Sequence, residues 1–249
     1  MKKLLLVFVV MISLFMITGC GNKSGKEFKE EYEALNGKVL KGDIKYRDLS
    51  INENNPYEKV SIDKIAEMIK NKETFYLYVG DPMCPWCRSG LEKMIEVANK
   101  EGIEKIYYVD FWDDEHNEIL RDLYDIEVED GKVTKVTKTR EEEAGYKVLY
   151  EAVYDYIQDY RVSKDGVEYP VGDGIKKVFG GDHFYFKDGK CVRYVSLRSD
   201  KLAKATDELT EEILKDQETN FTAFFKGNTC GCGGNKENGT CTCKDDCNC

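Results

Sequence analysis

The stretch Phe75-Tyr76-Leu77-Tyr78-Val79-Gly80-Asp81-Pro82-Met83-Cys84-Pro85-Trp86-Cys87, residues 75–87, decides the fold of this 249-residue chain. Residues 75–79 are continuously apolar or aromatic, which is typical of a central strand covered on both faces, and the following Gly-Asp-Pro ends it. Apolar residues then repeat at helical spacing until Gly102, and residues 106–111 form a second apolar run. The order strand, Cys-x-x-Cys, helix, strand predicts a right-handed parallel unit of the α/β class, with the cysteines where a strand ends and a helix begins.

The spacing of Cys84 and Cys87 suits thiol chemistry. A cysteine at a helix amino terminus meets unpaired backbone N–H groups and the positive end of the helix dipole, and both favour the thiolate, which is the attacking form of sulfur. A second cysteine one turn later can resolve a mixed disulfide on the first. Pro85 suits the first helical position. Arg88 is expected to add positive charge near the thiolate, and Trp86 to offer a partner an exposed aromatic ring.

Periodicity and turn residues predict the rest of the body. The expected elements are a helix over 62–71 capped by Ser61, a short helix over 113–124, a hairpin over 128–139 around Asp130-Gly131, a helix within 141–160, a hairpin over 182–197 around Asp188-Gly189, and a last helix that begins at Ser199 or Asp200 and contains Leu202, Ala205, Leu209 and Ile213.

At these residues the chain resembles the thioredoxin-fold family over roughly residues 46–225. The resemblance is carried by the strand 75–79, by Cys84-Pro85-Trp86-Cys87-Arg88, and by the hairpin turn Phe186-Lys187-Asp188-Gly189-Lys190. Within the family it is most similar to small membrane-associated Gram-positive proteins, including those described as bacteriocin transport accessory proteins. The resemblance implies a central mixed sheet flanked by helices, with a helical insertion between the second and third core strands.

The same resemblance implies a thiol-disulfide oxidoreductase that requires no cofactor, with Cys84 as nucleophile and Cys87 as resolving thiol. Trp86, Gly181 and Asp182 are the expected substrate-binding residues. Two positions depart from the family pattern: Gly181 stands where a cis-proline is usual, and Tyr78 stands where a buried acid is usual.

Isolated side chains near this region have ordinary structural interpretations. His183, on a predicted strand, is expected to be a satisfied structural histidine, and Cys191 a small buried residue. A zinc site at Cys84 and Cys87 is disfavoured because the body offers no second paired motif and only Cys191 and two histidines as further ligands.

The amino terminus indicates export. Lys2 and Lys3 precede an apolar run over 4–17 that is short for a permanent spanning helix. The ending Ile17-Thr18-Gly19-Cys20 resembles a lipobox, in which Cys20 is lipidated. We therefore expect a lipoprotein signal peptide over 1–19, a lipidated polar tether over 20–33, and a protein anchored in the lipid bilayer on the extracytoplasmic side of the cell membrane. An ordinary secretory peptide is the alternative.

The net charge and the expected location limit the classes of molecule that this protein can bind. The net charge of −10 argues against nucleic acid. Outside the cytoplasm disulfides persist, so the expected partners are exported proteins that carry thiols or disulfides, together with a membrane electron donor if the protein is a reductase.

The carboxyl-terminal segment differs from the rest of the chain. After a thioredoxin-like domain over 34–226, residues 227–249 contain no apolar residue for a core and are expected to be disordered. Six cysteines form three Cys-x-Cys pairs: Cys230, Cys232, Cys241, Cys243, Cys247 and Cys249. They suit capture of a soft metal, Cu or Zn, or pairing into disulfides, and an exchange of electrons with Cys84 and Cys87 is a third alternative. A membrane-tethered binding protein that sequesters or delivers metal is therefore the alternative function.

Overall fold

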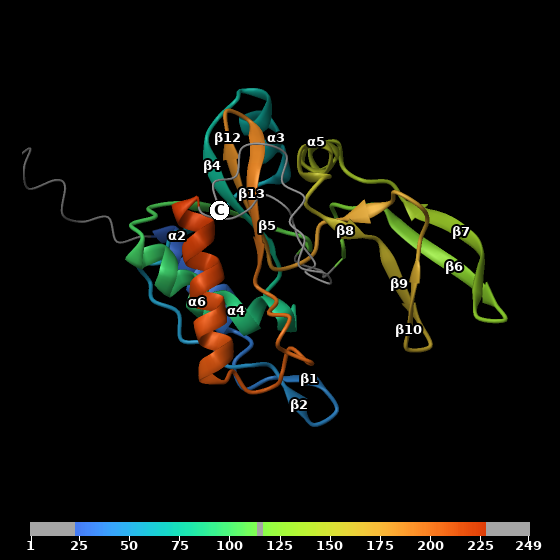
Figure 1. Cartoon of the computed structure of the whole chain (residues 1–249), viewed down its shortest axis with the longest axis horizontal. Helices are drawn as coiled ribbons and strands as arrows, with labels where there is room; N and C mark the ends of the chain where they lie inside the picture. Colours follow the sequence, from blue (N-terminus) through green and yellow to red (C-terminus); the bar gives the residue numbers. More distant parts are fainter. Residues whose placement is uncertain (1–22, 114–116, 228–249) are drawn as a thin grey trace, which may run out of the picture.

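The computed structural model describes residues 23–113 and 117–227. At its centre lies a five-stranded mixed sheet flanked by helices (Figure 1). The strand order across the sheet is β13-β12-β4-β5-β3. These strands are β3 (Tyr57–Lys59), β4 (Phe75–Gly80), β5 (Ile106–Asp110), β12 (Asp182–Lys187) and β13 (Lys190–Ser196). The chain therefore belongs to the α/β class, as predicted.

Strand β4 is central in both position and pairing. It runs parallel to β5, which is in turn parallel to β3, and antiparallel to β12, which forms a hairpin with β13. The predicted turn Asp188-Gly189 makes this hairpin with both residues at positive φ. The short strand β3 was not predicted, because three residues carry too little periodicity to be recognised.

Alternate residues of the central strand enter two separate apolar cores. Tyr78 packs on one face with α2 (Lys23–Glu33), α4 (Pro85–Lys100) and α6 (Glu211–Lys226). On the other face Phe75, Leu77 and Val79 pack with α3 (Ile62–Lys70) and α5 (Ala144–Val153). The unbroken apolar run at 75–79 thus reflects burial on both faces. Helices α3 and α4 lie where the sequence predicts them, and Ser61 caps α3 by accepting from the Lys64 N–H.

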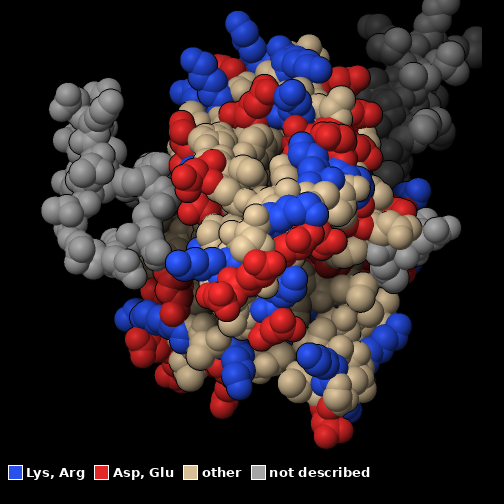
Figure 2. All heavy atoms as spheres, turned by 90° about the vertical axis from the view of Figure 1, so that its right-hand side faces the viewer, with Lys and Arg blue, Asp and Glu red and all other residues tan. Residues whose placement is uncertain are grey.

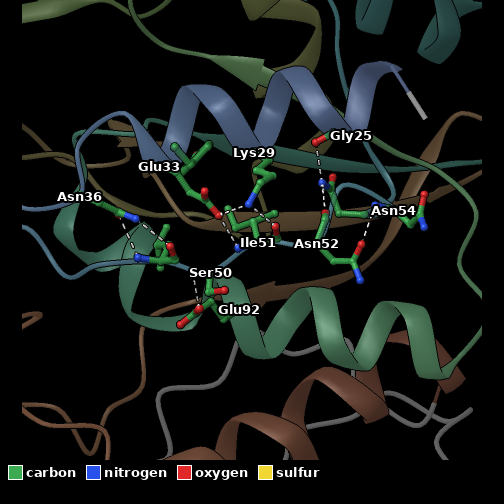
Figure 3. Close-up of polar contacts among 12 residues, drawn as sticks. Gly25, Lys29, Glu33, Asn36, Ser50, Ile51, Asn52, Asn54 and Glu92 are labelled. Atoms are coloured by element: carbon green, nitrogen blue, oxygen red, sulfur yellow. Dashed lines mark hydrogen bonds and ion pairs between the residues drawn. The ribbon is translucent and has the colours of Figure 1, made fainter. Parts of the chain in front are cut away.

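Helix α2 corrects the expected tether. Its described residues, 23–33, form a helix with Phe28 and Tyr32 buried in the core. Lys29 Nζ donates to the Ile51 carbonyl at 2.8 Å, and Glu33 Oε1 accepts from the Ile51 N–H at 2.7 Å (Figure 3). Side chains thus dock α2 on the backbone of the loop before β3, so this helix belongs to the folded domain.

Further hydrogen bonds connect both ends of the α2 region to the same segment before β3. Asn55 Nδ2 donates to the Gly25 carbonyl at 2.7 Å, and the Asn36 amide exchanges two hydrogen bonds with the Leu49 backbone, at 2.8 and 3.0 Å (Figure 3). Glu92 of α4 accepts from the Ser50 N–H at 2.7 Å. The segment before β3 is therefore held by side chains of both α2 and α4.

The insertion between β5 and β12 contains more strand than predicted. It contains α5 and three two-stranded sheets. Its strands are β6 (Leu123–Glu129), β7 (Lys132–Arg140), β8 (Gln158–Asp159), β9 (Arg161–Lys164), β10 (Val167–Pro170) and β11 (Lys176–Lys177). The predicted hairpin around Asp130-Gly131 is present and longer than expected. Seen from the side of these hairpins, acidic and basic side chains are interspersed (Figure 2).

One helix predicted in the insertion was wrong, and a second was predicted too long. In place of a helix over 113–124, the Ile119 N–H donates to the Phe111 carbonyl and Trp112 bridges to Glu118, so the chain doubles back along the end of β5. The helix predicted within 141–160 ends at Val153, because the residues that follow pair as β8 with β11.

The last helix begins later than predicted. Thr210 caps α6 by accepting from the Ile213 N–H, and residues 199–209 are irregular although Leu202 and Ala205 are buried. The Arg47 guanidinium accounts for this, because it binds the carbonyls of Ala205 and Asp207 that a helix would need. No helix within the described ranges is both long and apolar enough to cross a membrane.

Two small strands outside the sheet complete the fold. Strands β1 (Val39–Lys41) and β2 (Ile44–Lys45) form an exposed antiparallel pair after α2.

Candidate active site

The two cysteines lie at the start of α4, directly after the central strand. Cys84 is the N-cap residue, with Pro85 at the first helical position, and Cys84 Sγ accepts from the Cys87 N–H at 3.3 Å. The Cys84 N–H donates to the Asp81 carbonyl at 3.1 Å, which fixes the turn that leaves β4. Cys84 is half-buried, whereas the Cys87 side chain is fully buried.

The surroundings push the pKa values of the two thiols apart. The pKa of Cys84 is lowered, first by the hydrogen bond from the Cys87 thiol, and further by the backbone N–H groups of Cys87 and Trp86, against the opposing effects of burial and Asp81. The pKa of Cys87 is raised well above its ordinary value, chiefly by burial and then by Cys84. Cys84 is therefore the more exposed thiol and the one whose thiolate is favoured, whereas the buried Cys87 favours the protonated form.

A glycine loop before β12 faces both sulfur atoms. The Gly180 carbonyl lies 3.9 Å from Cys84 Sγ, and a Cβ placed on Gly180 would lie 3.2 Å from the Sγ atoms of both cysteines. Gly181, the residue expected to meet substrate, is buried at φ +105°, and its N–H donates to the Val79 carbonyl at 3.0 Å. Gly180, which the sequence reasoning missed, is the loop residue closest to the thiols.

Asp182 is buried, whereas a residue that binds substrate directly must be accessible at the surface. Its side chain is 2% exposed and accepts hydrogen bonds from the Phe179 N–H and the Tyr194 hydroxyl, at 2.8 and 2.9 Å. The carboxylate thus points into the protein and away from any partner at the surface. The expectation that Asp182 contacts substrate directly is corrected on this ground.

Tyr78 occupies the position six residues before Cys84. Its ring fills the space where a side chain on Gly80 would stand, since a Cβ there would lie 2.1 Å from the ring. Its hydroxyl is 2.8 Å from that of Tyr32 in α2. The interaction of Tyr78 with Cys87 lowers the pKa of this thiol, against the larger effect of burial. In the sequence, the four-residue spacing of Phe28 and Tyr32 is the signal that indicates helix α2.

His183 behaves as the expected structural histidine. It is fully buried, its Nε2 lies 2.8 Å from the Tyr57 hydroxyl, and its ring stacks on Tyr78 with centroids 4.5 Å apart. Burial lowers the pKa of His183 to about 3, so the ring stays neutral at physiological pH.

Two residues beside the cysteines differ from expectation. Arg88 is 1% exposed, and its guanidinium donates to the carbonyls of Arg47, Tyr32 and Pro82 and to Asn36 Oδ1. Its hydrogen bonds therefore hold backbone in place, and it is not among the main causes of the shift in the pKa of Cys84. Trp86 is half-buried, and the Arg198 guanidinium lies 4.6 Å from its ring, so one face of the indole is covered.

The remaining cysteines separate into two groups. Cys191 is half-buried in β13, packs against the core of the α3 face, and has its pKa raised to about 12 by burial. Cys20 and the six cysteines after Gly227 lie outside the described residues. Residues 23–113 and 117–227 contain no group of three or more His, Cys, Asp or Glu side chains placed to hold a metal ion.

Comparison with known proteins adds no assignment to this geometry. No protein-family model matches the chain, and no curated protein matches it.

Proposed function

We propose that this protein is a lipid-anchored, extracytoplasmic thiol-disulfide oxidoreductase with a thioredoxin-type fold. The fold proposal is supported by the strand order β13-β12-β4-β5-β3, with β3, β4 and β5 parallel and β12 and β13 antiparallel to their neighbours. It is also supported by the dithiol at the start of the helix that follows the central strand. Ligands of α/β proteins characteristically bind at this carboxyl edge of the strands.

The observation that carries the proposed activity is the unequal environment of the two thiols. The half-buried Cys84 has a lowered pKa, and the buried Cys87 beside it has a raised one. Disulfide exchange needs this combination, because the first thiol must attack as a thiolate while the second stays protonated until a mixed disulfide has formed.

The reaction follows in two steps. The Cys84 thiolate attacks one sulfur of a substrate disulfide, the substrate S–S bond breaks, and the second substrate sulfur leaves as a thiolate that takes a proton from solvent. The Cys87 sulfur then attacks Cys84 Sγ as its proton passes to the first substrate sulfur, which leaves as a thiol, and a Cys84–Cys87 disulfide forms. The substrate gains two electrons and two protons and the dithiol loses them. The reverse sequence oxidises a substrate dithiol.

The same proposal assigns partners by location. With Cys20 acylated, the domain stands at the outer surface of the membrane and meets exported proteins that carry thiols or disulfides. A reducing cycle also requires a membrane electron donor to return the Cys84–Cys87 disulfide to the dithiol. Cell fractionation tests the anchor. The wild-type protein should stay in the membrane fraction, and the Cys20→Ala variant should be released from it.

Cysteine variants test the activity. Cys84→Ser should abolish reduction of insulin by dithiothreitol above the rate of the free dithiol, and Cys87→Ser should accumulate a mixed disulfide between Cys84 and substrate. Cys191→Ser is the matched control, because this thiol is half-buried in β13, and it should retain wild-type activity. Insulin reduction by wild type no faster than by free dithiol would exclude the proposal.

The cysteine-rich tail supports a second candidate, binding of a soft metal. Three Cys-x-Cys pairs fall within residues 230–249, and closely spaced thiolates bind Cu(I) or Zn(II). Elemental analysis of protein purified without chelator should find stoichiometric copper or zinc, and deletion of residues 228–249 should remove it. Metal-free protein with all six tail thiols oxidised would contradict this candidate.

A further inference from the structure

The loop Phe179–Asp182 has little intrinsic means of holding its shape beside the dithiol. Two of its four residues are glycines, and Gly181 adopts φ +105°, a conformation that other residues rarely adopt. Gly180 also cannot carry a side chain without displacing sulfur, since a Cβ would lie 3.2 Å from both Sγ atoms. The close approach of backbone to the thiols therefore depends on contacts made by neighbouring residues.

Asp182 supplies those contacts. Its Oδ2 accepts from the Phe179 N–H at 2.8 Å, and its own N–H donates to the Phe179 carbonyl at 3.3 Å. These two bonds close a ring around the two glycines. Its Oδ1 accepts from the Tyr194 hydroxyl at 2.9 Å, which ties the loop to β13. Gly181 is held in addition through its carbonyl, which accepts from the Leu197 N–H at 2.9 Å.

We propose that Asp182 is a positioning residue for disulfide exchange, whose carboxylate holds the Gly180 backbone beside Cys84 at the surface where a substrate chain must dock. This inference rests on the proposed function. Asp182 reaches no sulfur atom among its hydrogen bonds, so it acts through the loop. A displacement of the docking surface by about 1 Å is enough to slow a reaction that needs three sulfur atoms in line, by up to about a hundredfold.

The ionisation of Asp182 links this positioning to pH. Burial raises its pKa to about 7, against the hydrogen bonds from Phe179, Tyr194 and Ser196 and the charge of Arg121. The neighbour of Asp182 on its own strand, His183, is neutral, and the residue paired with Asp182 on β4 is Val79, which does not titrate. A protonated carboxyl has a hydrogen that must be donated and binds the Phe179 N–H less strongly than a carboxylate does. The hydrogen bond from the Phe179 N–H, which closes the loop, should therefore be weaker below pH 7.

The test compares wild type, Asp182→Asn and Asp182→Ala between pH 5.5 and 8.5. Two rates are measured: alkylation of Cys84 by iodoacetamide, and reaction of Cys84 with a disulfide-linked peptide. Asp182→Ala should slow peptide exchange at pH 8 at least about tenfold without slowing alkylation, because only the peptide needs the docking surface. Asp182→Asn keeps the shape of the side chain, and should exchange more slowly than wild type above pH 7 and equally below it.

Controls separate positioning from unfolding. Resistance of Cys87 to alkylation reports an intact fold, and Asp188→Asn alters a similar, exposed residue at the far end of β12. If Cys87 becomes reactive in Asp182→Ala, that variant is not intact, and the positioning role is then judged from Asp182→Asn alone. Wild-type exchange rates and pH profiles in both Asp182 variants would overturn the positioning role and leave the proposed function intact. A wild-type protein with protected Cys87 and no peptide exchange would overturn both.

Discussion

The hydroxyl oxygens of Tyr32 and Tyr78 lie 2.8 Å apart in the interior of the protein. This contact joins α2, the first described helix, to the strand that leads into the cysteine turn. Since Tyr78 also interacts with Cys87, helix α2 contributes through Tyr32 and Tyr78 to the environment of the buried thiol.

Removal of either hydroxyl should cost stability and weaken the resolving step. Tyr32→Phe and Tyr78→Phe each leave one buried hydroxyl without its partner, and should lower the free energy of unfolding by about 1–3 kcal/mol in urea titrations. Tyr78→Phe should also raise the pKa of Cys87 further, so that a mixed disulfide on Cys84 persists longer in rapid-quench measurements.

Tyr108→Phe is the matched control for this pair. Tyr108 is buried and stacks on Tyr78, but its hydroxyl makes no hydrogen bond of normal geometry within the described part of the chain. Its removal should leave the resolving rate unchanged. If Tyr108→Phe slowed resolution as much as Tyr78→Phe, packing rather than the hydroxyl would be responsible.

Gly180→Ala should impair exchange more than it impairs folding. The added methyl group would lie 3.2 Å from both sulfur atoms, so it should push the dithiol or the loop out of place. Gly166→Ala provides the comparison, because Gly166 has φ +80° in open space at a hairpin turn. That change should cost about 1–2 kcal/mol of stability with full exchange activity. Equal exchange rates in wild type and Gly180→Ala would contradict the proposed docking surface.

Asp182 and His183 should make the free energy of unfolding change with pH in opposite directions. The pKa of Asp182 is raised to about 7, so the folded state keeps a proton that the unfolded state loses, and this contribution to stability falls as pH rises from about 4 to 7. The pKa of His183 is lowered to about 3, so its contribution falls as pH drops from about 6.5 to 3. Urea titrations at pH 4, 5.5 and 7 should show the stability of Asp182→Asn, relative to wild type, increasing with pH. A pH-independent difference would show that Asp182 ionises normally.

Arg88→Ala should destabilise the protein without changing the nucleophile. The variant removes a buried side chain that binds three carbonyls and Asn36, and should cost about 3 kcal/mol or more. The pKa of Cys84, followed by thiolate absorbance, should stay near its wild-type value. Arg198→Ala, an exposed change beside Trp86, should alter stability by no more than about 0.5 kcal/mol. A large rise in the pKa of Cys84 in Arg88→Ala would restore the electrostatic role expected from sequence.

The local pattern at residues 75–111 predicted the centre of the molecule well. A continuous apolar run, an N-capping cysteine and a Gly after the helix each report local geometry, and the structure has the strand, the turn and the helix in place. The insertion was harder to predict, because its short hairpins and the chain reversal after Phe111 depend on pairing with distant backbone. Likewise, Arg47 claims the carbonyls that a helix at Ser199 would need.

The sequence predicted where the two cysteines lie, but not which residues surround and hold them. Cys84 and Cys87 followed from spacing, whereas Gly180 and the burial of Asp182 depend on a loop folding back from 96 residues away onto the start of α4. The role of Arg88 was misjudged because a charge next to a thiol in sequence points toward the backbone of α2 in space.

Equilibration of the full-length protein in glutathione redox buffers, followed by acid quenching and peptide mapping, shows whether Cys84 and Cys87 form a redox couple. We expect Cys84 and Cys87 to pass together from dithiol to a mutual disulfide in one two-electron transition, while Cys191 remains a thiol. Independent titration of the two cysteines, or no disulfide between them at any buffer ratio, would contradict this expectation.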